Sequence, residues 1–153
     1  MANQSTEQST EKKPFLERVI DKCDLETTNE AQAATNVVFR IMRDMMPNET
    51  VDRIEGDLQV EAPLANMEVA DLWSDTNTMV AFFSRISPLR PIDISAETFM
   101  LRLNQEGFLP ADTSPEQVTK AVFAATKDEL SSERVQDVAK ALPEDVRQLW
   151  ETA

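Results

Sequence analysis

The sequence predicts an all-α fold, made of two tandem helical repeats of about four helices each that pack into one globular pseudo-twofold bundle. Three observations lead to this prediction. Glycine, which tight turns between strands need, occurs only at Gly56 and Gly107 in 153 residues. Apolar residues recur at helical spacing between capping signals. The segment from Phe15 to Leu58 also matches, without gaps, the segment that lies 84 residues further along the chain.

The first repeat is expected over residues 14–73, after a polar tail at residues 1–13 whose composition predicts disorder. Pro14 suits the first turn of a helix, because its fixed φ is already helical and its missing N–H is not needed there. The apolar face of that first helix is expected to comprise Phe15, Leu16, Val19, Ile20 and Cys23.

Two more helices are expected in the first repeat. The residues from Thr27 to Glu30 have the pattern of a capping box, which opens the second helix, and Pro47 ends it. Asn48 is expected to cap the third helix. The two apolar stripes comprise Ala31, Ala34, Val38, Ile41, Met42 and Met45 in the second helix, and Val51, Ile54 and Leu58 in the third.

The second repeat is expected over residues 96–153. Comparison at a shift of 84 gives ten identities over the 44 positions from Phe15 to Leu58. The helix signals recur: Ser95 is a cap, Gly107 is a stop, and Ser114 with Pro115 is a start. The identical pairs are Phe15–Phe99, Arg18–Arg102, Leu25–Leu109, Thr35–Thr119, Val38–Val122, Phe39–Phe123, Asp44–Asp128, Glu49–Glu133, Val51–Val135 and Leu58–Leu142.

A short fourth helix ends each repeat with a tryptophan. The stretch EVADLW, which ends at Trp73, matches DVRQLW, which ends at Trp150, now at a shift of 77. Two copies are too few for an open solenoid, which needs about three repeats. The copies are therefore expected to pack their apolar faces together.

A connecting segment at residues 74–95 lies outside the duplication. Met79, Phe82, Phe83 and Ile86 predict a short amphipathic helix within it. Pro88 and Pro91 predict extended chain after that helix.

The order of these helices resembles a bacterial family known as domain of unknown function 2267. The stretches FLERV at Phe15–Val19 and KAVFAATKDELSSERVQDVAKALPEDVRQLW at Lys120–Trp150 are similar to it, as is the duplication. The stretches DLWSDTN and FFSRISP resemble a variant associated with photosynthetic bacteria. The resemblance implies an all-α fold of two repeats and no established activity, and the segment at residues 74–95 departs from the commoner family pattern.

Charge and composition exclude several classes of protein. A net charge of −13 repels phosphate backbones and anionic lipid head groups, so neither nucleic acid nor direct membrane insertion is expected. A single cysteine, the absence of a signal sequence and the absence of a long apolar run predict a cytoplasmic protein.

No residue pattern indicates catalysis, and no cofactor or metal site is predicted. The chain has no histidine and no tyrosine, which removes the commonest general base and metal ligand. Cys23 continues an apolar helix face and is expected to be a buried structural thiol. Asp44 and Asp128 recur in both repeats near a helix C-terminus, which favours a local structural role over a functional one.

Six residues are candidates for an interface. Trp73 and Trp150 are expected either as core residues of their repeats or as exposed anchors. Phe82 and Phe83 are adjacent aromatics that are difficult to bury together, and Arg85 and Arg90 form a locally positive strip beside them.

Three functions remain open at this point. The preferred hypothesis is a non-enzymatic interaction or regulatory adaptor that binds another protein, or a second copy of itself, through grooves between helices or through residues 74–95. The resemblance adds an expected link to stress or photosynthesis. The alternatives are a carrier with a pocket for a small apolar ligand between the repeats, and an enzyme that uses carboxylates and a metal ion.

Overall fold

A computed structural model describes residues 13–61, 69, 71–73 and 93–153. The described residues are helical or irregular and include no strand, so the fold is all-α as predicted. Val69 and residues 71–73 are also helical. The helices with complete bounds are α2 (Phe15–Asp21), α3 (Thr28–Met45), α4 (Asn48–Glu61), α7 (Ala96–Glu106), α8 (Pro115–Asp128), α9 (Ser132–Ala141) and α10 (Glu144–Thr152).

Local signals determine where most of these helices begin. The capping box is present: the Thr27 hydroxyl accepts a hydrogen bond from the Glu30 N–H, and the Glu30 carboxylate accepts one from the Thr27 N–H. The hydroxyls of Ser95 and Ser114 cap α7 and α8, each accepting a backbone N–H bond of 3.2 Å from the residue three positions on. These three starts agree with the sequence prediction.

Two predicted boundaries were wrong by one residue. Asn48 is the first residue of α4 rather than its cap, and Pro14 precedes α2 in the cap position instead of lying in the first turn. The predicted stop of α7 at Gly107 is confirmed, and a Cβ atom there would lie 2.7 Å from the Leu103 carbonyl oxygen. The helix starts of α4 and α9, at positions 48 and 132, differ by the same 84 residues that relate the sequences.

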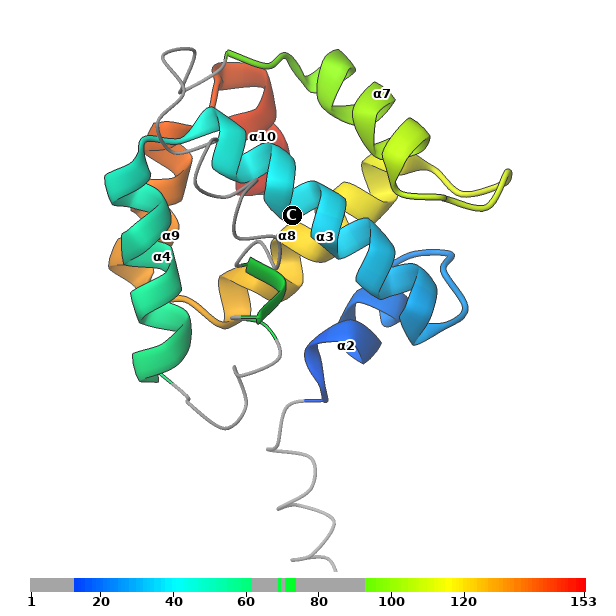
Figure 1. Ribbon diagram of the computed structural model, residues 1–153, viewed down its shortest axis with the longest axis horizontal. Helices are drawn as coiled ribbons and strands as arrows, with labels where there is room; N and C mark the ends of the chain where they lie inside the picture. The colour runs from blue at the N-terminus through cyan, green and yellow to red at the C-terminus, as the bar shows by residue number, and fades with distance from the viewer. Residues whose placement is uncertain (1–12, 62–68, 70, 74–92) are drawn as a thin grey trace, which may run out of the picture.

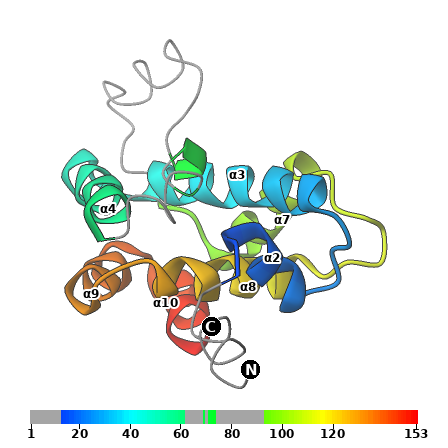
Figure 2. The ribbon, with the colours of Figure 1, turned by 90° about the horizontal axis from the view of Figure 1, so that it is seen from below.

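Helices from the two halves of the chain pack on each other. Figure 1 shows α3 and α8 crossing in the centre, with α4 and α9 together on one side and α2 and α7 on the other. Viewed from below, α3 and α4 lie in one layer, and α8 and α9 lie in the other (Figure 2). The packing between the halves is reciprocal: α2 packs on α8 as well as on α3, and α7 packs on α3 as well as on α8.

Each half contains the same buried triad of aromatic rings. In the first half, Phe39 lies between Phe15 and Trp73, at centroid distances of 6.1 and 5.1 Å. In the second half the corresponding distances are 5.9 and 5.2 Å, and both tryptophans meet their phenylalanine at 70°. Such edge-on contacts are favourable beyond the area they bury. The second triad consists of Phe99, Phe123 and Trp150.

The polar edge of each indole is also bound in the same way. Trp73 donates from Nε1 to the carbonyl of Val51 at 3.2 Å, and Trp150 donates to that of Val135 at 3.1 Å. A cation then binds each tryptophan carbonyl and lies over the indole ring: Arg43 in the first half and Lys127 in the second. These positions correspond at the shift of 84.

Candidate functional site

Two of the six residues predicted from the sequence as an interface, Trp73 and Trp150, are buried in the structure. Trp73 and Trp150 are each 1% exposed, so their assignment as exposed anchors is corrected: both indoles complete the core of their half. Burial is favourable because each indole packs against a phenylalanine ring and its N–H donates to a backbone carbonyl, so no polar group of the ring is left without a partner. The other four candidates, Phe82, Phe83, Arg85 and Arg90, lie outside the described residues.

The recurring aspartates Asp44 and Asp128 form reciprocal ion pairs between the halves. Arg18 on α2 lies 3.2 Å from Asp128, and its equivalent Arg102 on α7 lies 3.4 Å from Asp44. Arg18 also binds the buried carboxylate of Glu129. The aspartates therefore have a structural role, but it is not confined to the helix C-terminus as expected: Asp128 joins α8 to α2, and Asp44 joins α3 to α7.

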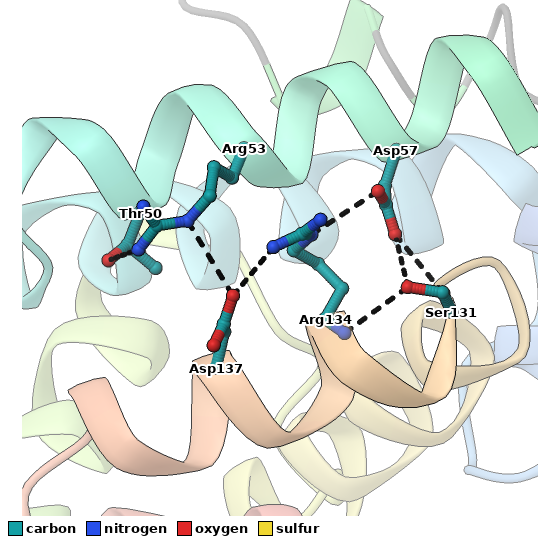
Figure 3. A network of polar contacts seen from close by, with 6 residues as sticks. All are labelled: Thr50, Arg53, Asp57, Ser131, Arg134 and Asp137. Carbon is teal, nitrogen blue, oxygen red and sulfur yellow. Dashed lines mark hydrogen bonds and ion pairs between the residues drawn. The ribbon is translucent and has the colours of Figure 1, made fainter.

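A second polar network joins α4 to α9 and does not repeat. The Asp57 carboxylate accepts hydrogen bonds from the Ser131 hydroxyl at 2.8 Å and from the Ser131 N–H at 3.2 Å (Figure 3). Arg134 forms ion pairs with Asp57 at 3.2 Å and with Asp137 at 2.6 Å, and Arg53 lies 3.6 Å from Asp137. Because Arg53 and Asp137 correspond at the shift of 84, equivalent positions here hold opposite charges.

This network affects the pKa of Asp57. Burial alone would raise the pKa of the carboxyl, but the hydrogen bonds from Ser131 and Arg134 together lower it below its usual value. The pKa of Arg134 is lowered by burial and raised more strongly by Asp57 and Asp137, so the guanidinium stays charged. The charges of the network are thus used in binding α4 to α9.

The second half has an open groove beside the N-terminal ends of α7 and α8 and along α10. Two adjoining hollows of about 550 and 490 Å³ share Asp145 and Gln148 as lining residues. Met100 and Leu149 lie half-buried in the second hollow. The lining comprises Asp93, Ser95, Thr98, Pro143, Glu144, Asp145 and Gln148 in the first, and Ala96, Glu97, Met100, Glu116, Asp145, Gln148, Leu149 and Thr152 in the second.

A hydrogen bond joins two helix ends within the groove. The Asp145 carboxylate accepts a hydrogen bond of 2.8 Å from the Ala96 N–H of α7 and one of 2.8 Å from the Val146 N–H of its own helix. Carboxylates bind well at helix N-termini, because the first N–H groups have no partner within the helix. Asp145 therefore fixes the position of α10 against α7, and both helices pack on α8. We refer to the thirteen lining residues given above as the α7–α10 groove.

The corresponding positions of the first half are closed. Leu16, which matches Met100, is 5% exposed, and Leu72, which matches Leu149, is 7% exposed. Position 97 is a glutamate at the edge of the groove, whereas its match in the first half is Lys13. Helical periodicity does not indicate this groove; the signals in the sequence are changes of charge between matching positions, such as Lys13 to Glu97.

Phe108 is a large apolar residue that is exposed and has an unusual backbone conformation. Its side chain is 83% exposed, and its φ of 55° lies in the left-handed region that glycine tolerates and bulky residues rarely adopt. It directly follows the Gly107 cap of α7. Its match in the first half is Asp24, which does not have positive φ.

The described residues offer little for catalysis. Within them, no three His, Cys, Asp or Glu side chains lie close enough together to hold a metal ion. Cys23 is half-buried, its thiol donates to the Val19 carbonyl at 3.2 Å, and burial raises its pKa, so little reactive thiolate forms at neutral pH.

Among the described helices, none combines the length and the apolar character that a membrane crossing requires.

The comparison with known proteins agrees with the family resemblance. No curated protein matches the chain. The family described as "Uncharacterized conserved protein (DUF2267)" matches residues 12–149, which is most of the 153-residue sequence. The chain therefore belongs to the DUF2267 family.

Proposed function

We propose that this protein is a non-enzymatic protein-interaction module, an adaptor that binds another protein through the α7–α10 groove. The observation that supports this most directly is that Met100 and Leu149 are only partly buried in the groove, while their counterparts Leu16 and Leu72 are buried. Apolar side chains left open in a hollow with a polar edge are typical of the surface on which a partner docks.

The structural roles of two sets of charged residues also support a binding role, since these residues are used in packing rather than catalysis. The arginines and aspartates that recur between the halves form structural ion pairs, and the α4–α9 charges bind the two layers together. The metal-dependent enzyme has no support among the described residues, since no suitable cluster of ligands lies there. The hypothesis of a carrier for small apolar ligands has little support. Pockets that hold such ligands are enclosed, whereas both hollows of the groove are open.

The test is co-purification from the native host with three variants of the full chain. Met100→Glu places a charge on the apolar floor and is expected to lose the partner that the wild type retains. The double change Glu133→Gln and Asp112→Asn removes two exposed carboxylates outside the groove and is expected to retain it.

A third variant tests the connecting segment, the other site that the sequence suggested. Phe82→Ala with Arg85→Glu is expected to retain the partner if the groove is the binding site. Circular dichroism and denaturant titration of each variant establish that it is folded. Retention of the partner by a folded Met100→Glu protein would refute the groove as the site, and its loss in the connecting-segment variant alone would transfer the function to residues 74–95.

A further inference from the structure

The α7–α10 groove has an acidic edge. Its described lining residues include five carboxylates and no lysine or arginine. The side chains of those carboxylates are exposed to solvent. They belong to Asp93, Glu97, Glu116, Glu144 and Asp145.

Asp145 differs from the other four carboxylates, because it alone of the five forms hydrogen bonds with described residues. Asp145 holds α10 against α7, as described above. Glu97 and Glu116, in contrast, have no hydrogen bond or ion pair with another described residue, and they belong to different helices, α7 and α8. Both line the hollow that contains Met100 and Leu149. Beside the apolar floor therefore lie two carboxylates that no described residue pairs.

The first half shows that this charge is a local feature. At the position of Glu97 the first half has Lys13, which binds Asp21 at 2.8 Å, and the leucines at the floor positions are buried. At the position of Glu116 the first half has the neutral Gln32. The acidic edge thus occurs where the apolar floor is open, in the second half.

We infer that the occupant of the groove is a basic amphipathic helix of a partner protein; this inference rests on the proposed function and specifies its ligand. Apolar residues at i and i+4 of such a helix would contact Met100 and Leu149, and flanking Lys or Arg residues would meet Glu97 and Glu116. The two adjoining hollows make the groove elongated, which suits a helical segment better than a compact ligand. The net charge of −13 attracts a basic segment and repels a second copy of this chain.

The experiment measures binding of synthetic peptides to the full chain by fluorescence anisotropy. The probe is a labelled helical peptide of about four turns, with leucines at i and i+4 and lysines on both flanks. One control peptide has the same composition in an order that removes the apolar stripe, and another has glutamate in place of each lysine. Only the basic amphipathic peptide is expected to bind, with an affinity that falls at least about tenfold as salt rises from ~50 to ~300 mM.

Two variants with the same change in net charge separate the groove from the overall field. Glu97→Lys with Glu116→Lys is expected to weaken binding at least about tenfold, whereas Asp112→Lys with Glu133→Lys has a much smaller effect. Equal weakening by both variants, or equal binding of the rearranged peptide, would overturn the inference, since either result indicates attraction by net charge alone.

Other results distinguish this inference from the proposed function. If Met100→Glu abolishes co-purification of the host partner while the basic peptide does not bind, the interaction module stands and a basic helix is the wrong ligand. Sedimentation of the wild type tests whether a second copy of the chain occupies the groove instead. A dimer that the double change Glu97→Lys with Glu116→Lys dissociates would show that it does, and would overturn the inference.

Discussion

Leu16 and Leu72 in the first half of the molecule are buried, and Met100 and Leu149 at the matching positions of the second half are partly buried and line a groove. The aromatic triads beneath these positions are the same in both halves, to within 0.2 Å in their centroid distances. The two halves thus have the same aromatic contacts and differ in the burial of these apolar residues. A surface that differs over a common core is where a binding function is expected.

The largest effects are expected where the halves agree. Phe39 and Phe123 are both fully buried in the centre of their triads, so replacing either by alanine leaves a cavity and removes two ring contacts. Each change should lower the free energy of unfolding by about 3–5 kcal/mol in a denaturant titration. A loss below about 1 kcal/mol at either position would show that the two triads are not equivalent.

The reciprocal arginines should differ in importance. The Arg18 side chain is 13% exposed and binds Glu129, which is 2% exposed, whereas Arg102 and Asp44 are 25% and 21% exposed. Arg18→Ala removes the guanidinium from a buried carboxylate and should lower the free energy of unfolding by about 3 kcal/mol. Arg102→Ala should lower it by about 1 kcal/mol, because its pair is closer to water.

Equal losses for the two arginines would contradict this reading of the ion pairs. The sequence showed that Arg18, Arg102, Asp44 and Asp128 recur, but it did not show what they do. Each arginine binds the aspartate of the other half, so the contact joins residues 58 or 110 positions apart and depends on how the halves pack. A comparison along one chain identifies matching positions and not the partners that tertiary packing gives them.

The α4–α9 network should respond to pH. The folded-state pKa of Asp57 lies below its unfolded value of about 3.8, so its contribution to stability is complete above that pH and is lost as the pH falls through the folded pKa. Asp57→Asn should cost about 2 kcal/mol at neutral pH. The difference from wild type should shrink in urea titrations below about pH 4. A difference that is constant down to pH 2 would exclude Asp57 as the group responsible.

The smallest effect is expected at the exposed phenylalanine. Phe108→Gly should raise the free energy of unfolding by about 0.5–1 kcal/mol, because glycine adopts positive φ without strain. The matched change Asp24→Gly should lower it, since Asp24 lacks positive φ and glycine adds only entropy to the unfolded chain. Destabilisation by Phe108→Gly would show that the ring contributes contacts in spite of its exposure.

Local sequence signals predicted the elements of the fold better than its surface. Thr27, Ser95, Ser114 and Gly107 act through hydrogen bonds within four residues, and all four helix boundaries that they predicted are present. The groove was missed because Met100 and Leu16 have the same apolar character and the same helical spacing. Their exposure differs through packing by segments distant in the chain, which periodicity does not report.

The central claim is that a common scaffold is closed over Leu16 and open over Met100. The most direct test is the loss in free energy of unfolding on replacing each residue by glutamine, in otherwise wild-type protein. Leu16→Gln buries an amide in the core and should cost about 3 kcal/mol, whereas Met100→Gln keeps its polar end in water and should cost about 1 kcal/mol. Equal losses would show that the second half is as closed as the first, and would remove the basis for a binding groove there.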